Sequence, residues 1–457
     1  MSVSTSVFSG VLDLLPGDPD ALLFCGAQPV RRGDFLRRVT ALAATLPDAP
    51  ALINLCERRD HFIAAFCAAA LRGQVTLLPP SRAPQMVAEV AAAHPQALRV
   101  GDMDEIDCDV RVDKATAHTA TIQPARVEAA QLAMIGFTSG STGQPSAHRK
   151  CWGALGHTDA VNQQLLTALC GGAAHIVATV PPQHMYGMEL SVLLPLFGAF
   201  AVHPGRPFFP EDIARALAEC DAPRLLVTTP VHLRALLESG VALPPLAGIV
   251  SATAPLAPAL AARAEARFGC QLRELFGATE VCIFAERRPS HETTWRLLDQ
   301  VRLQPEREGT QVFRPSLPQP VMLADMVELS ADGRSFELRG RQADLLEIAG
   351  KRASLADLTR RLQAIEGVVD GAMLQLDADA AGVRRLLAVV VAPGMDDATL
   401  IAHLRQASDP VFLPRRIIRV AALPRNETGK LPRQALLALL AEADQGAGDT
   451  FTPDTTC

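Results

Sequence analysis

The sequence lacks any run of about 18 uncharged apolar residues, which is roughly what a helix needs to cross a bilayer. Its N-terminus, MSVSTSVFSGVLDLLPGD, also lacks the basic start and the apolar core of a secretory signal peptide. The ten cysteines are scattered, and no Cys-x-x-Cys pair occurs. This pattern argues against a disulfide framework or a zinc site and favours reduced thiols in the core. Together, these absences predict a cytoplasmic protein with no membrane insertion.

A broad cationic surface is absent as well. The formal net charge is −6 and the pI is about 6.0, whereas a general nucleic-acid binder needs an extended positive face. With 49% hydrophobic and 20% charged residues, the composition is that of an ordinary globular protein. Its 457 residues are enough for at least two domains. We therefore expect a globular protein of two or more domains that has no nucleic-acid partner.

The first 340 residues or so alternate short apolar stretches with Ala-rich or amphipathic ones. Such stretches occur as consecutive pairs at 51–55 and 60–71, at 174–180 and about 189–196, and at 224–229 and 231–237. Alternating strands and helices are typical of an α/β domain with mostly parallel sheets, whose ligand sites lie in loops beyond the carboxyl ends of the strands. We expect a large N-terminal domain of this class over residues 1–340.

The pattern changes near residue 341. Leucines recur at helical spacing in SLADLTRRLQAIEGV, and RRLLAVVVAP is typical of a buried strand. A second helix is expected near 399–406 and a second strand near 417–421. These elements predict a small α+β C-terminal domain over residues 341–445, followed by a flexible polar tail at 446–457.

The segment GFTSGSTGQPSAHRK, residues 136–150, has the composition of a phosphate-binding loop. Its hydroxyls and glycine-turn N–H groups can point together at an anion. It cannot be written as G-x-x-x-x-G-K-[ST], and runs of Ser, Thr and Gly also occur as flexible linkers. The apolar run 132–135 before it and Pro145 after it favour a strand that ends in a ligand loop.

Two further segments are weak signals when each is taken alone. In ELFGATE, a strand that ends at Gly277 presents Thr279 and Glu280, although this could be a plain strand-to-loop turn. In LPRNETGKLPR, Gly429 permits a tight turn before Lys430, although most exposed lysines are simply solvated.

The order of these pieces resembles the adenylate-forming superfamily, which includes acyl- and aryl-CoA synthetases, adenylation domains and luciferases. The resemblance extends from FCGAQPVRRGDFLRRVTALAATL, near the N-terminus, to Arg433. It rests on T-S-G-S-T-G-x-P, then F-G-x-T-E, then G-R, then P-x-x-x-x-G-K-x-x-R.

The resemblance implies a role for each matching residue. Thr279 would contact the α-phosphate, Glu280 would hold Mg²⁺, and Lys430 would bridge the carboxylate and the α-phosphate. The ribose would be bound by Asp325 and Arg341. The residues expected to cradle the β- and γ-phosphates of ATP are Thr138, Ser139, Gly140, Ser141, Thr142 and Gly143. The residues expected to border the acid pocket are His184, Tyr186, Gly187 and Gly277.

The chemistry fits this assignment. Joining a carboxylate to ATP brings two anions together, so fixed cations and hydrogen-bond donors must lower the barrier. Because a carboxylate is already ionised at neutral pH, the first step needs no general base. Its products would be an acyl adenylate and pyrophosphate. In this family a pantetheine thiol then attacks the adenylate, after the C-terminal domain has rotated.

The sequence departs from the family pattern in three places. The Lys-Gly pair that usually follows T-G-x-P is replaced by Ser146 and Ala147, which we expect to lower the rate without abolishing the reaction. We consider that Arg149 or Lys150 supplies the missing charge. The segment 340–344 reads G-R-Q-A-D, which leaves the hinge residue at Ala343 or Asp344, and the usual T-G-D reads L-A-D at 323–325.

The substrate is less well defined. The segment QHMYG, residues 183–187, contains no aspartate that could bind an α-amino group, which disfavours amino acids. The chain looks similar to the stand-alone ligases of aryl-polyene and xanthomonadin-type pathways, which load aromatic acids onto an acyl carrier protein. A basic cluster near the C-terminus could receive that carrier protein, bind a phosphate of CoA, or be a solvated face. Its members are Arg415, Arg416, Arg419, Arg425 and Arg433.

Three other functions stay open. The protein could be a medium- or long-chain fatty acyl-CoA or acyl carrier protein synthetase. It could be a non-catalytic homologue that binds ATP or acyl-AMP, which loss of Lys430 or Glu280 would have favoured. It could also be an interaction protein without nucleotide chemistry, which the ordered motifs disfavour.

Overall fold

The computed structural model describes residues 8–113, 124–139, 145–341, 345–348, 351–376, 386–426, 429, 431–432 and 435–441. The chain divides into two compact units. The first consists of Met1–Arg302 with Val312–Val321, and the second of Leu303–Gln311 with Met322–Cys457. This division does not test the domain boundary expected near residue 340, which stays a prediction.

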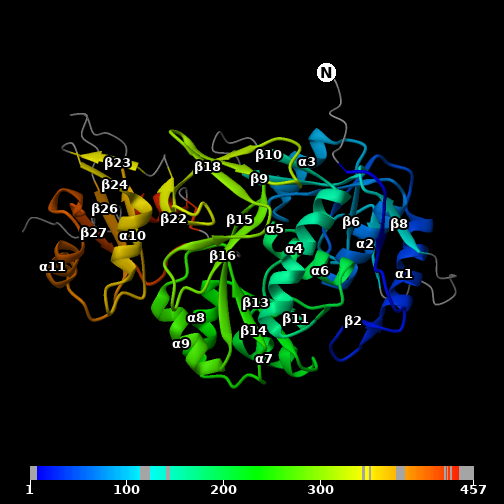
Figure 1. Ribbon diagram of the computed structural model, residues 1–457, viewed down its shortest axis with the longest axis horizontal. Helices are drawn as coiled ribbons and strands as arrows, with labels where there is room; N and C mark the ends of the chain where they lie inside the picture. Colours follow the sequence, from blue (N-terminus) through cyan, green and yellow to red (C-terminus); the bar gives the residue numbers. More distant parts are fainter. Residues whose placement is uncertain are drawn as a thin grey trace, which may run out of the picture. The chain divides into compact units, whose positions relative to one another are not determined.

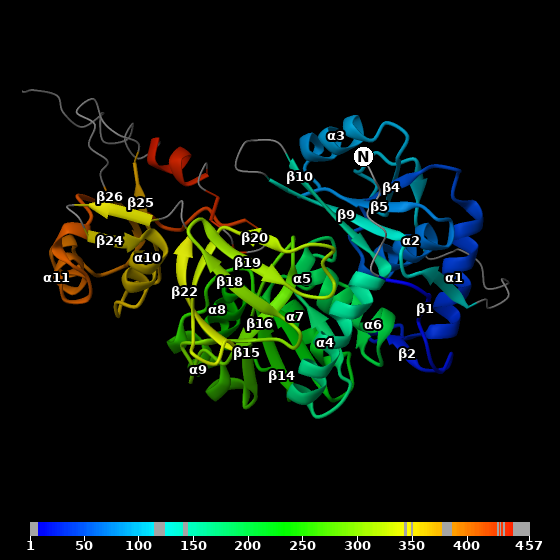
Figure 2. The same ribbon diagram turned by 45° about the horizontal axis from the view of Figure 1, so that its top comes forward.

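One sheet of the first unit carries the strand of the predicted phosphate segment. Its strands lie in the order β10 (Pro145–Cys151), β9 (Leu132–Ser139), β5 (Val75–Leu78), β4 (Ala51–Asn54), β6 (Leu98–Gly101) and β7 (Val110–Arg111). All neighbours run parallel except β9 and β10, which form the antiparallel pair drawn in teal in Figure 2. Buried side chains such as Ile53, Leu77 and Ile135 form the core beneath this sheet.

Helices around this sheet form where the sequence is apolar or Ala-rich. They are α1 (Arg32–Thr45), α2 (Arg59–Leu71) and α3 (Pro84–Ala93). Nearly every residue of α2 is buried, because FIAAFCAAA has no polar face. A separate two-stranded sheet pairs β1 (Val11–Leu14) with β8 (Ala125–Glu128).

The larger sheet is parallel through its centre. In the first unit its strands follow the order β17 (Trp295–Leu297), β16 (Cys282–Arg287), β15 (Gln271–Ala278), β14 (Gly248–Ser251), β13 (Arg224–Thr228), β11 (His175–Ala178), β12 (Ala201–Val202), β2 (Leu22–Phe24) and β3 (Val30–Arg31). The pairs from β15 to β2 are parallel, and β16, β17 and β3 are antiparallel to their neighbours. The predicted α/β class with mostly parallel sheets is therefore confirmed.

Three helices cover one face of this sheet (Figure 1): α7 (Pro210–Ala218), α8 (Pro230–Ser239) and α9 (Pro258–Phe268). Each begins at a proline, whose fixed φ suits the first helical turn and whose missing N–H is not needed there. Their buried faces, for example Leu217, Leu233 and Ala261, pack on Val177, Leu226 and other strand residues.

A second helical layer contains α4 (Trp152–Cys170) and a stretch with three parts. The stretch consists of α5 (Met185–Met188), a π-helical turn at Glu189–Leu193, and α6 (Leu194–Phe197). The sequence predicts a helix near 189–196 but not the π turn within it. This stretch packs against α4, and both α4 and α5 contact β16.

Three short strands form a sheet where the chain passes between the units: β18 (Arg302–Glu306), β19 (Gly309–Phe313) and β20 (Val321–Leu323). The second unit then contains the hairpin β21 (Asp325–Leu329) and β22 (Ser335–Arg341), and the pair β23 (Leu345–Ile348) and β24 (Lys351–Ser354).

The predicted small α+β domain is present in the second unit. Its sheet consists of β25 (Asp370–Gln375), β26 (Leu386–Val391) and β27 (Arg416–Arg419), with α10 (Leu355–Gln363), α11 (Asp397–Ala407) and a 3₁₀ turn at Pro410–Phe412. Ser354 and Asp396 cap the two helices by accepting hydrogen bonds from the N–H groups of Asp357 and Thr399. Across both units, the helices in the described part of the chain are too short or too polar to span a bilayer.

Candidate active site

The predicted phosphate segment forms a β-hairpin. β9 and β10 pair with Thr138 opposite Ser146 and Ser139 opposite Pro145. Pro145 therefore starts a returning strand rather than only ending the loop. Gly140, Ser141, Thr142 and Gly143 lie outside the described residues.

Thr279 and Glu280 lie in the turn of a second hairpin. β15 and β16 pair antiparallel with Ala278 opposite Cys282, so residues 279–281 form the turn. Gly277 is needed for this geometry, since a Cβ there would lie 2.7 Å from the carbonyl oxygen of Cys282. Glycine at 277 thus lets the two backbones approach at the base of the turn.

The two hairpins come from different sheets, and the turn at Thr279–Glu280 lies beside the strands β9 and β10. The Oγ1 of Thr138 shares a hydrogen bond of 3.0 Å with the Nε2 of His148, and that nitrogen lies 3.9 Å from a carboxylate oxygen of Glu280. A Cβ on Gly136 would lie 3.5 Å from the methyl group of Thr279. The structure therefore brings Thr138, Thr279 and Glu280 together.

His148 was not expected at this site. Burial, and to a smaller extent the positive charge of Lys150, lower the pKa of His148, although the carboxylate of Glu280 acts in the opposite direction. The imidazole is thus neutral near pH 7 and can hydrogen-bond to Thr138 without adding charge.

Strand alternation separates the side chains of β10. Lys150 is buried and donates a hydrogen bond of 2.5 Å from its Nζ to the main-chain carbonyl of Glu280, whereas Arg149 is exposed. Because neighbouring residues of a strand face opposite sides, Arg149 faces away from Lys150. Lys150 holds the backbone of the turn, and the expectation that Arg149 or Lys150 supplies the charge missing at Ser146 stays a prediction.

Two more buried charged residues contact the end of this turn and the start of β16. Both carboxylate oxygens of Glu189 accept a hydrogen bond from the N–H of Ile283, at 3.0 and 3.1 Å. An Nη atom of Arg314 donates to the carbonyls of Val281 and Ile283, at 2.7 and 3.0 Å. Glu189 could have been noticed in the sequence, because it is a charged residue within the apolar run MYGMELSVLLPLF. Arg314 stands out less in its own sequence context.

Three of the four expected acid-pocket residues lie in or next to α5, and the fourth, Gly277, lies in β15. His184 precedes the helix and is half-buried, while Tyr186 and Gly187 are buried within it. The hydroxyl of Tyr186 donates to the carbonyls of Thr228 and Val250, at 3.1 and 3.0 Å, near the carboxyl ends of β13 and β14. Tyr186 therefore ties α5 to the sheet.

In the second unit, the two predicted ribose residues lie opposite each other. Asp325 begins β21, Arg341 ends β22, and their Cα atoms are paired in the hairpin. The side chain of Arg341 is not among those described. The hinge candidates Ala343 and Asp344 also lie outside the described residues.

Lys430 lies outside the described residues, but Gly429 just before it does not. Arg425 donates from one Nη to the carbonyl of Gly429 at 2.8 Å, and from its other two nitrogens to both carboxylate oxygens of Asp370 at 2.8 Å. The N–H of Gly429 donates to the carbonyl of Asn426 at 2.8 Å. These contacts hold the turn that leads to the lysine.

The basic C-terminal cluster is partly neutralised. Arg425 pairs with Asp370 and Arg419 pairs with Asp397, both at 2.8 Å. Arg415 and Arg416 are exposed, and Arg433 lies outside the described residues. The cluster therefore offers less free positive charge than the sequence predicts.

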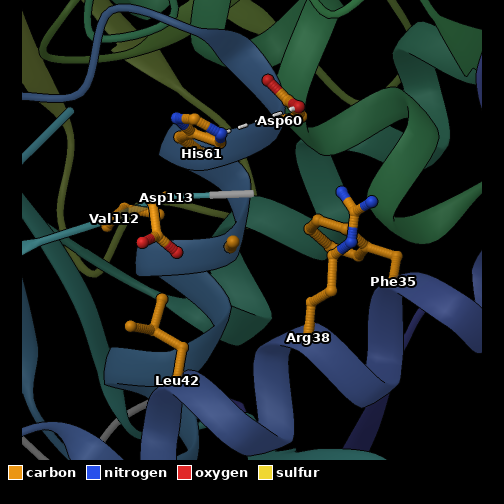
Figure 3. A pocket seen from close by; sticks show the side chains of 8 residues that line it. Phe35, Arg38, Leu42, Asp60, His61, Val112 and Asp113 are labelled. Carbon is orange, nitrogen blue, oxygen red and sulfur yellow. Dashed lines mark ion pairs between the residues drawn. The ribbon is translucent and has the colours of Figure 1, made fainter. Parts of the chain in front are cut away.

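A small hollow in the first unit lies elsewhere, between α1 and α2 (Figure 3). It is lined by Phe35, Arg38, Leu42, Asp60, His61, Ala64, Val112 and Asp113, none of which belongs to the predicted site. The Nδ1 of His61 lies 3.0 Å from Asp102, a carboxylate that also accepts hydrogen bonds from the N–H groups of Glu57 and Arg58.

Among the side chains that are described, no group of three or more His, Cys, Asp and Glu residues could hold a metal ion. Glu280 is a single carboxylate with 36% of its side chain exposed. Mg²⁺ in nucleotide enzymes is commonly held by one or two carboxylates together with the phosphates of the substrate. One accessible carboxylate beside a hydroxyl-bearing hairpin fits that mode of binding.

Comparison with known families identifies the class. The model of the AMP-binding enzyme family matches residues 51–310, which is more than half of the chain. The chain therefore belongs to the AMP-binding enzyme family, and the resemblance to the adenylate-forming superfamily is confirmed.

Individual relatives are ligases. The chain is 29% identical to a 4-coumarate–CoA ligase of Halorhodospira halophila over 351 residues, which cover 73% of this chain and 79% of the relative. It is 29% identical to the fatty acid–[acyl-carrier-protein] ligase MmaC of Mycobacterium marinum over 133 residues, which cover 28% and 25%. These matches confirm the predicted enzyme class, an acid–thiol ligase.

The fold has solved counterparts. The o-succinylbenzoate CoA synthetase MenE of Bacillus subtilis, in complex with its acyl-adenylate intermediate, aligns with a TM-score of 0.76 at 16% identity. The alignment covers 92% of this chain and 95% of the other. At this identity the likeness establishes the fold.

Proposed function

We propose that the protein uses ATP and Mg²⁺ to activate a carboxylic acid as an acyl adenylate and then transfers the acyl group to a pantetheine thiol. The observation that carries this proposal is the meeting of Thr138, Thr279 and Glu280 where the turn of one hairpin lies beside the strands of another, in a chain of the AMP-binding enzyme family.

In the first step a carboxylate oxygen attacks the α-phosphorus of ATP. The bond from that phosphorus to the bridging oxygen breaks, and pyrophosphate leaves with the electron pair. Thr279 donates a hydrogen bond to the α-phosphate, while Thr138 and the 139–143 loop bind the β- and γ-phosphates. Glu280 holds Mg²⁺, which neutralises phosphate charge when bound.

Lys430 supplies the positive charge between the carboxylate and the α-phosphate. Its position depends on the turn before it, where Arg425 joins the carbonyl of Gly429 to Asp370. A bidentate Arg–carboxylate pair has a defined geometry, so it suits a positioning role. Asp325 and Arg341, neighbours across one hairpin, bind the ribose hydroxyls.

In the second step the thiol sulfur attacks the carbonyl carbon of the adenylate. AMP leaves, a thioester forms, and the thiol proton is released to solvent. For this step the part of the chain beyond about residue 340 rotates and takes Lys430 away from the adenylate.

The acid we propose is aromatic. A 4-coumarate–CoA ligase is a relative over most of the chain, and 4-coumarate is an aromatic acid. His184 and Gly187 border the acid pocket. The hydroxyl of Tyr186 is already hydrogen-bonded to two main-chain carbonyls, so Tyr186 offers the acid its apolar ring rather than a polar contact.

The acceptor we propose is an acyl carrier protein, with CoA as the alternative. MmaC, a carrier-protein ligase by name, supports the first over about a quarter of the chain, and the 4-coumarate–CoA ligase supports the second over a longer match. The MmaC match also keeps a fatty acid as an alternative substrate.

Pyrophosphate release, measured with ATP and Mg²⁺ over a panel of aryl, medium-chain and long-chain acids, tests the proposal. We expect release with aryl acids and its loss in Lys430→Ala. A thioester assay with CoA and with a carrier protein that bears a free pantetheine thiol then distinguishes the acceptors. ATP binding without release for any acid would instead favour a non-catalytic homologue.

A further inference from the structure

Three charged side chains from distant parts of the chain hold the backbone of residues 280–283. Lys150 of β10 binds the carbonyl of Glu280, 130 residues away in sequence. Glu189 binds the N–H of Ile283, 94 residues away, and Arg314 binds the carbonyls of Val281 and Ile283. We call these three residues the turn clamp.

The turn clamp is buried. The exposed fractions are 6% for Lys150, 1% for Glu189 and 6% for Arg314. Burying a charged group is costly unless hydrogen bonds replace its lost contacts with water. The three charges are therefore stable only while the backbone stays where their hydrogen bonds form, which suits a clamp that specifies one backbone conformation.

The charges are also satisfied by the turn rather than mainly by one another. Glu189 accepts hydrogen bonds from the N–H of Ile283 and from the side chain of Asn162 on α4. Lys150 and Arg314 donate to main-chain carbonyls. Each charged group is thus aimed at a backbone atom within residues 280–283.

The backbone directly after the turn is strained. Cys282 has a φ of 66°, in the left-handed region that a non-glycine residue seldom adopts. Such conformations persist where the surroundings determine the backbone, and they gather at functional sites. Glu189 also begins a π-helical turn, another feature frequent at functional sites.

We propose that Lys150, Glu189 and Arg314 are positioning residues that hold Thr279 and Glu280 in place relative to Thr138. This inference rests on the proposed function, in which Thr279 and Glu280 act on the α-phosphate and Mg²⁺. Lys150 comes from the phosphate hairpin and Glu189 from the helix after His184 and Gly187. The clamp therefore joins three of the motif segments at one turn.

The test compares Lys150→Met with Lys150→Arg and Glu189→Gln. For Lys150→Met we expect pyrophosphate release to fall about 100-fold, since misplacing a catalytic group by an ångström has an effect of that size. The Mg²⁺ concentration for half-maximal rate should rise about tenfold, as for other outer-shell changes. The KM for the acid should stay near that of the wild type, and Lys150→Arg should restore part of the rate.

The matched control is Glu286→Gln. Glu286 is an equally buried carboxylate of β16 that pairs with Arg273 and Arg296 outside the turn. It should lower the unfolding temperature without changing the Mg²⁺ dependence. If Lys150→Met does not fold, Glu189→Gln, which keeps the shape and one acceptor oxygen, should still show the Mg²⁺ shift.

Calorimetric binding of ATP with Mg²⁺ and with EDTA gives a readout that needs no turnover. We expect the clamp variants to lose part of the Mg²⁺-dependent affinity. Folded clamp variants with wild-type rate and Mg²⁺ dependence would overturn the inference and leave the proposed function intact. A wild type that binds MgATP but releases no pyrophosphate with any acid would contradict the proposed function alone, because binding still tests the clamp.

Discussion

The turn at Thr279–Glu280 and the turn before Lys430 are held in different ways. The first is fixed by three buried charged residues that are distant from their partners in sequence. Lys150 is 130 positions away, Glu189 is 94 positions away, and Arg314 is 33 and 31 positions away from its two partners. The second is held by Arg425, four residues from Gly429, and by Asp370, whose side chains are 21% and 17% exposed. All of its partners belong to the second unit.

The difference fits two tasks. The first turn is bonded to three buried charged residues, so it cannot shift without breaking several hydrogen bonds. It therefore suits groups that bind the same phosphate and metal in every cycle. A turn held within its own unit keeps its shape wherever that unit goes. It suits the lysine that, under the proposed function, leaves the site before the thiol step.

The largest effect is expected from Arg314→Met. It leaves two buried carbonyls without a donor, and at about 1–3 kcal/mol for each we expect a loss of about 4 kcal/mol in the free energy of unfolding. Urea unfolding measures it. Arg302→Met, at an exposed arginine that lies over the ring of Phe313, should cost about 0.5 kcal/mol. Equal losses of unfolding free energy in Arg314→Met and Arg302→Met would contradict the view that buried charges fix the first turn.

Gly277→Ala should come next. The added Cβ would lie 2.7 Å from the Cys282 carbonyl oxygen and must push β16 away, at a cost of about 3 kcal/mol. Because the turn then moves, pyrophosphate release should fall with stability. Gly101→Ala, where the nearest atom would be 3.6 Å away, is the control and should leave the activity unchanged.

Asp159, a buried acidic residue whose pKa the charge of Glu189 affects, predicts that the stability of the protein depends on pH. Burial raises the pKa of Asp159 from 3.8 to about 7, with the charge of Glu189 acting in the same direction and a hydrogen bond from Gln163 acting against it. Between these pH values the folded state holds the proton and the unfolded state does not, so stability falls as the pH rises from about 4 to about 7.

Asp159→Asn should remove that slope and stabilise the protein at pH 8 by on the order of 2 kcal/mol relative to the wild type. Thermal or urea unfolding at pH 5 and pH 8 measures it. A wild-type stability that stays constant or rises over this range would show that Asp159 does not titrate in this way.

The smallest effect on stability is expected in the second unit. Arg425→Met breaks a partly exposed pair and should cost about 1 kcal/mol. Its effect on pyrophosphate release should nevertheless be clear, because the lysine turn loses its support.

A double-mutant comparison sharpens this prediction. In the Lys430→Ala background, Arg425→Met should lower the residual rate no further, since the arginine acts through the lysine. Thioester formation from supplied acyl adenylate should be unaffected and serves as the control. Equal effects in both backgrounds would assign Arg425 a general structural role.

The sequence by itself determined the fold class and most elements. Apolar runs such as 51–54 and 224–228 form parallel strands, since buried strands are apolar on both faces. The order of the motifs was enough to indicate the superfamily, which the family match confirms. It also led to Thr138, Thr279 and Glu280, because loops at strand ends are local features of sequence.

The tertiary structure alone decided which partner each buried charge finds. Lys150 and Arg149 are neighbours in sequence, and only the alternation of β10, with its register against β9, shows which one faces inward. Glu189 and Arg314 meet Ile283 because α5, β16 and the chain near residue 314 pack together. A contact across 94 residues depends on that packing, and no local pattern encodes it.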